Sequence, residues 1–131
     1  MPPTSFVVSG VPAPKGSRIS GRRKDGSIFT RPASKGEHTW VEAVAKIAGT
    51  QPRLQPPYSV ELHFSMPRPK KPSHEYPTRG DLDKLVRAVL DGLTRGGVIV
   101  DDRHVTDLSA AKFWAEQGDE GVAVTVESVP V

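Results

Sequence analysis

The chain has 131 residues, is 36% hydrophobic and 25% charged, and contains 13 prolines and no cysteine. This length supports one hydrophobic core, so we expect a single domain over residues 1–131, and the lack of cysteine excludes disulfides and thiolate metal sites. No apolar run approaches the roughly 20 residues of a membrane span and no signal-peptide pattern begins the chain, so we expect a cytoplasmic protein without membrane contact.

The charge is divided unevenly along the chain, although the net charge is only +3. Residues 1–80 hold 13 Lys and Arg against 5 Asp and Glu, a balance of +8, and residues 81–131 hold 5 against 10, a balance of −5. A basic half suits a polyanion and an acidic half suits bound cations, so the pattern favours a protein that acts on nucleic acid. A solvated basic loop is the other interpretation.

The first predicted elements are a short strand over residues 6–8 and a basic hairpin. Asp25-Gly26 is typical of a hairpin turn, with residues 27–30 as the returning strand. The arm around this turn is expected to lie along DNA phosphates, and a surface hairpin kept soluble by its charge is the alternative. Its basic residues are Lys15, Arg18, Arg22, Arg23, Lys24, Arg31 and Lys35.

A helix over residues 36–48 and a strand over residues 58–66 follow. Ser34 and Glu37 form a capping-box pattern ahead of the helix, and Trp40 falls on its apolar stripe, which favours core packing over stacking on a base. Residues 58–66 alternate between apolar and polar, which predicts a strand with one buried face. The Pro-rich loop that follows carries four more candidate phosphate contacts, which are Arg68, Lys70, Lys71 and Arg79.

The segment from residue 81 to residue 97 predicts an acidic amphipathic helix. Its apolar residues recur at helical spacing, Asp81 suits the N-cap, and Gly96-Gly97 supply the stop. Asp83, Arg87 and Asp91 then share one side of the helix. Residues 98–100 are expected to form a short strand that ends at an acidic pair, and residues 105–114 and 121–129 two further strands. The fold class is therefore α+β, with a mixed β-sheet and two principal helices.

Two acidic motifs stand about twenty residues apart and are expected to converge on one point. They are the Asp-x-Asp of Asp81 and Asp83, and the pair Asp101-Asp102. Carboxylates without cysteine or clustered histidine are ligands of hard cations, so Mg²⁺, or Mn²⁺, is the expected occupant. Such an ion would support phosphodiester hydrolysis. A helix cap and a turn are the structural alternatives for the two motifs. A phosphate-binding loop is absent, so no nucleotide cofactor is expected.

Residues 77–93, followed by Asp101-Asp102-x-x-Val105 and later Lys112-Phe113, resemble the RusA family of Holliday junction resolvases. The flanking residues 10–16 and 64–70 fit the same family, so the likeness covers most of the chain. The resemblance implies a Mg²⁺-dependent homodimer that introduces paired nicks in four-way DNA junctions, in bacteria or their phages.

The resemblance also implies roles for individual residues. Asp81, Asp83 and Asp102 correspond to the metal-binding catalytic acids, and Asp91 and Asp101 to further positions that are usually acidic. Two positions depart from the family pattern. Lys84 stands where asparagine is usual and Arg87 where lysine is usual, and arginine does not deprotonate. We hypothesise that Lys84 supplies, from a neighbouring position, the amine that a lysine at the position of Arg87 usually provides. Nicking of other branched DNA, such as flaps or forks, and junction binding without catalysis are the rival functions.

Overall fold

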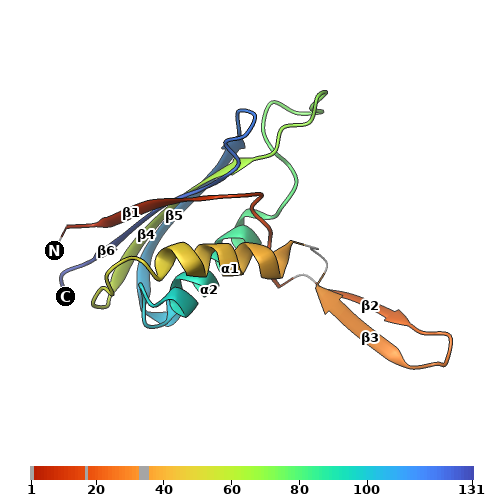
Figure 1. Ribbon diagram of the computed structural model, residues 1–131, viewed down its shortest axis with the longest axis horizontal. Coiled ribbons are helices and arrows are strands. Elements are labelled where there is room, and N and C mark those ends of the chain that lie inside the picture. Colours follow the sequence, from red (N-terminus) through yellow and green to blue (C-terminus); the bar gives the residue numbers. More distant parts are fainter. Residues whose placement is uncertain (1, 17, 33–35) are drawn as a thin grey trace.

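The computed structural model describes residues 2–16, 18–32 and 36–131 (Figure 1). The elements are β1 (Thr4–Ser9), β2 (Arg18–Arg22), β3 (Ile28–Pro32), α1 (Glu37–Ala48), β4 (Tyr58–Met66), α2 (Leu82–Gly96), the short 3₁₀ helix η1 (Asp102–His104), β5 (Val105–Trp114) and β6 (Gly121–Ser128). This is the predicted α+β class, with a mixed sheet and two principal helices. Within the described ranges, no helix has the length and apolar character needed to cross a bilayer.

The main sheet has the strand order β1-β6-β4-β5, and α1 and α2 lie together on one of its faces (Figure 1). β4 is antiparallel to β6 and parallel to β5. A parallel neighbour requires a long crossover connection, and α2 supplies it. Every second residue of β4 is buried, from Tyr58 to Met66, as the alternation predicted. The apolar sides of both helices pack on this face, so the core fixes where the polar side of α2 points.

Glycine allows the two helices to approach closely. A Cβ on Gly92 of α2 would lie 2.5 Å from Cγ1 of Val44 on α1. A Cβ on Gly96 would lie 2.6 Å from the Cβ of Ala48. Trp40, on the same helix as Val44, is buried as predicted. The small residues of α2 therefore allow α1 to pack at short range.

The basic hairpin formed by β2 and β3 extends away from the rest of the domain (Figure 1). Its turn is the predicted Asp25-Gly26, and Gly26 has the positive φ of +92° that this turn needs. The Asp25 carboxylate accepts hydrogen bonds from the Ser27 hydroxyl (2.7 Å) and backbone N–H (2.9 Å). These bonds lower the pKa of Asp25, so the turn is held by an ionised side chain.

Two local predictions need correction. Residues 98–100 are not a strand, because their backbone groups bond outside the sheet: Val98 N–H donates to Leu93 O, and Val100 N–H to the Tyr58 hydroxyl. The acidic pair therefore precedes β5 rather than ending a strand. The N-cap of α1 is Gly36, without a side-chain cap, and Ser34 of the predicted capping box lies outside the described residues.

Candidate active site

Asp81 occupies the predicted N-cap of α2, but its side chain does not cap the helix. Its backbone is extended (φ −62°, ψ 130°), and no side-chain hydrogen bond closes the first turn. The carboxylate is 71% exposed and lies 3.8 Å from the Lys84 ammonium. A capping role alone therefore does not account for this acid, which is available to a ligand.

The turn before Asp81 is anchored to the sheet by Lys112. The Lys112 ammonium, on β5, donates a 2.8 Å hydrogen bond to the backbone carbonyl of Gly80. Gly80 has a φ of +77°, which favours glycine. This contact joins residues 32 positions apart. In the sequence, Lys112 stands out only through the family resemblance, and no local pattern indicates this contact.

Arg87 lies on the polar side of α2, one turn from Asp83 and one turn from Asp91. Its guanidinium packs against Gly16, because a Cβ added there would collide with the Arg87 Nη1 atom. The same loop is bonded to α2 through Lys15 N–H, which donates to Lys84 O at 3.0 Å. Among the described side chains, no ion pair of 4.0 Å or less joins Arg87 to Asp83. The guanidinium therefore lies against the loop after β1, on the side of α2 that also carries Asp83 and Asp91.

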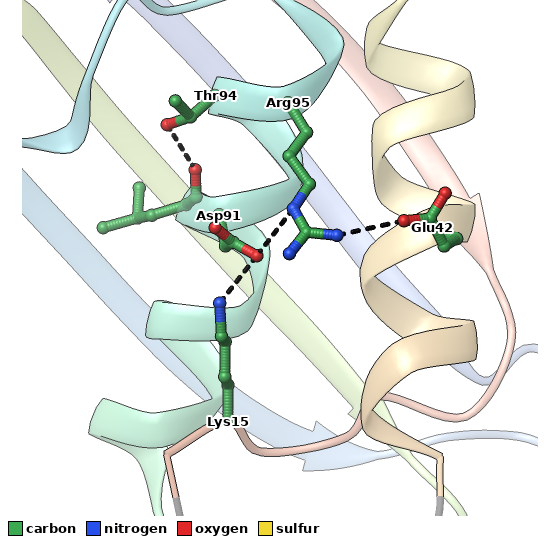
Figure 2. A network of polar contacts seen from close by, with 6 residues as sticks. Lys15, Glu42, Asp91, Thr94 and Arg95 are labelled. Atoms are coloured by element: carbon green, nitrogen blue, oxygen red, sulfur yellow. Dashed lines mark hydrogen bonds and ion pairs between the residues drawn. The ribbon is translucent and has the colours of Figure 1, made fainter.

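Asp91 belongs to an ion-pair network that joins both helices to the loop after β1 (Figure 2). Its carboxylate lies 2.7 Å from the Lys15 ammonium and 3.2 Å from Arg95 Nε. Arg95 reaches across to Glu42 of α1 at 3.0 Å. Lys15, a predicted phosphate contact, is thus paired with Asp91 here. This arrangement gives Asp91 a structural role that the sequence analysis did not identify.

Asp101 and Asp102 form an acidic pair at the start of η1. Asp101 caps the turn by accepting a 3.1 Å bond from Arg103 N–H, and this bond foremost lowers its pKa. The hydrogen bond with Asp101 raises the pKa of Asp102, and burial and the charges of Asp101 and Asp91 add to this, while Arg87 opposes it. These neighbours therefore make ionisation of Asp102 less favourable than that of a free aspartate, and a further cation nearby would favour it.

In residues 2–16, 18–32 and 36–131, no three acidic or histidine side chains are gathered as a metal site. The predicted convergence of Asp81, Asp83 and Asp102 on one ion thus stays a prediction. The donor set itself fits Mg²⁺, because it consists of carboxylates. One of them, Asp102, has a pKa raised by its acidic neighbours, and a bound cation would relieve that repulsion. Mg²⁺ commonly takes one or two carboxylates together with substrate phosphates, so a cage built only from protein is not required.

The predicted phosphate contacts fall on two surfaces. Arg22, Arg23 and Lys24 are exposed on the hairpin, where Arg23 lies over the Phe29 ring at 5.2 Å. The side chains of Arg18 and Arg31, and Lys35 as a whole, lie outside the described part. The loop between β4 and α2 exposes the other four, which are Arg68, Lys70, Lys71 and Arg79.

A known protein family has a sequence pattern that matches this chain. The family model described as endodeoxyribonuclease RusA matches residues 9–127 of the 131. The match spans both helices, β4, β5, nearly all of β6 and every candidate acid, and it begins at the last residue of β1. No curated protein matches the chain significantly. The resemblance of residues 77–105 is confirmed by this match over nearly the whole sequence. The chain therefore belongs to the RusA family of endodeoxyribonucleases.

Proposed function

We propose that the protein is a Mg²⁺-dependent, structure-selective endonuclease that resolves four-way DNA junctions by paired nicks. Family membership supports nuclease activity on DNA and Holliday junction resolution in general. The observation that carries the proposal is the place of Arg87. It lies one helical turn from Asp83, and its charge opposes the rise in the pKa of Asp102. Arg87 therefore lies near acids of both α2 and η1.

The chemistry follows from these side chains. Asp81 and Asp83, with Asp102, would hold the divalent ion, which when bound activates a water and stabilises charge on the phosphodiester. Arg87 stays charged and offers forked donors to phosphate oxygens. Arg87 cannot transfer a proton, because arginine does not deprotonate. Lys84, whose ammonium lies beside Asp81, would take that role. Nicking by Lys84→Ala at the rate of the parent protein would contradict this role of Lys84.

The proposal includes a homodimer in the cytoplasm of a bacterium or phage-infected cell. Symmetric nicks in a junction require two sites related by a two-fold axis, which a homodimer provides. The exposed cations of the hairpin and of the loop between β4 and α2 would contact phosphates on the junction arms. Binding led by phosphates weakens steeply as salt rises, so a flat salt response would count against this mode of recognition.

The test is a nicking assay on a synthetic four-way junction, on flap and fork substrates and on a matched linear duplex, in Mg²⁺ and in EDTA. The variant is Asp83→Asn. The control is Asp119→Asn, in the exposed turn between β5 and β6. We expect Mg²⁺-dependent nicking of the junction that Asp83→Asn abolishes and Asp119→Asn retains, with junction binding intact in both variants. Equal nicking of flaps or forks would indicate the broader nuclease. Tight binding without nicking in any metal would indicate a binding protein.

A further inference from the structure

A pocket of about 610 Å³ lies between three segments that are distant in the sequence. Its walls come from the loop after β1, from the loop of residues 67–80 and from Trp114 at the end of β5. Gly80 lines the pocket and directly precedes Asp81, so the pocket adjoins the first acid of the Asp-x-Asp pair. This volume falls within the range of about 300–1,000 Å³ that is usual for small-molecule sites.

The side chains that line this pocket are mostly apolar or basic. Several prolines and Met66 form its apolar walls, and Trp114 is the aromatic side chain among them. Three cations from one loop complete it, namely Arg68, Lys71 and Arg79, all of them exposed. In the part of the chain that the structure describes, no acidic side chain lines the pocket. Its chemistry suits a flat ring that stacks on the aromatic side chain and has a negatively charged group attached to it.

Trp114 is held in place by a hydrogen bond from its indole ring and by a backbone hydrogen bond of the residue that follows it. Its indole N–H donates to His74 O at 3.3 Å, and the following amide, Ala115 N–H, donates to Met66 O at 2.8 Å. The polar atom of the indole is therefore already used, and the ring is half-buried. A ring fixed in this way loses little conformational freedom when a planar ligand stacks on it.

We propose, on the basis of the proposed function, that this pocket binds an unstacked nucleobase next to the cleaved phosphate. The base would stack on Trp114, and the three cations would contact its phosphates. Charge complementarity decides the occupant, because basic and apolar lining matches a nucleotide and would repel a basic peptide. A base stacked within a duplex is covered on both faces and cannot enter. The pocket would thus favour strands whose stacking is interrupted, as at a branch point.

The experiment measures binding of four-way junctions in EDTA, so that no step depends on cleavage. Single abasic sites are scanned through the three nucleotides on either side of the crossover in one strand. The variants are Trp114→Leu, which removes the ring, and Trp114→Phe, which keeps a smaller one. The control is Phe113→Leu, an exposed aromatic on the opposite face of β5. The same series on single-stranded DNA separates base binding from junction selectivity.

For the intact junction, we expect Trp114→Leu to weaken binding about tenfold, within the range for one stacked base. Trp114→Phe recovers most of the affinity, and Phe113→Leu changes little. At one abasic position the affinity of the parent protein for the junction should also fall about tenfold. At that position the affinity of Trp114→Leu should equal its affinity for the intact junction. Unchanged binding by Trp114→Leu, or a loss that persists undiminished at every abasic position, would overturn the proposal. If the parent protein prefers neither junction nor duplex, the proposed function fails, and the single-strand series still decides the pocket.

Discussion

Tyr58→Phe tests how the fold holds the segment that leads to the acidic pair. The Tyr58 side chain is fully buried, and its hydroxyl donates to Leu54 O at 3.0 Å and accepts from Val100 N–H at 3.1 Å. Removing the hydroxyl leaves both backbone groups unpaired. Each lost hydrogen bond costs about 1 kcal/mol, so the free energy of unfolding should fall by about 2 kcal/mol.

Urea unfolding at equilibrium measures this loss. At a slope of about 2 kcal/mol per M, within the usual range, the urea midpoint falls by about 1 M. Tyr76→Phe is the matched control, because Tyr76 is 62% exposed, and its stability should stay within about 0.5 kcal/mol of the parent protein. Since Val100 directly precedes Asp101, nicking by Tyr58→Phe should also decrease. Equal midpoints for the two variants would refute the reasoning.

Three further predictions concern single sites. Gly92→Ala places a methyl group against Val44, so urea unfolding should show a loss of about 1–3 kcal/mol; stability equal to the parent would mean that the helices separate freely. The hydrogen bond with Asp101 and the nearby acidic charges raise the pKa of Asp102 in the folded protein, so its ionised form opposes folding. Asp102→Asn should therefore increase stability at neutral pH and leave it unchanged below the pKa of free Asp, about 3.9, while abolishing nicking; lower stability at neutral pH would contradict this. Lys112→Met releases Gly80, so nicking should fall tenfold or more with junction binding in EDTA unchanged, and partial recovery by Lys112→Arg would separate positioning from loss of folding.

Local patterns in the sequence were sufficient where near neighbours decide the structure. The alternation of residues 58–66, the Asp25-Gly26 turn and the apolar spacing of residues 82–93 correctly predicted β4, the hairpin and α2. The same logic failed for residues 98–100. Their β-branched side chains are typical of a strand, but the segment buries Val98 and Ile99 in the core and bonds to Leu54 and Tyr58 instead. Tertiary partners overrode local propensity there.

The sequence by itself determined most of the secondary elements, the uneven charge and the acidic motifs with their family, because these depend mainly on residues close together in the chain. Only the tertiary structure decided what surrounds the acids. Lys112 reaches Gly80, and Lys15 reaches Asp91, across long stretches of sequence. The tertiary structure also places Trp114 beside the loop that precedes α2. Such contacts depend on how the core packs the helices on the sheet, and no local periodicity encodes them.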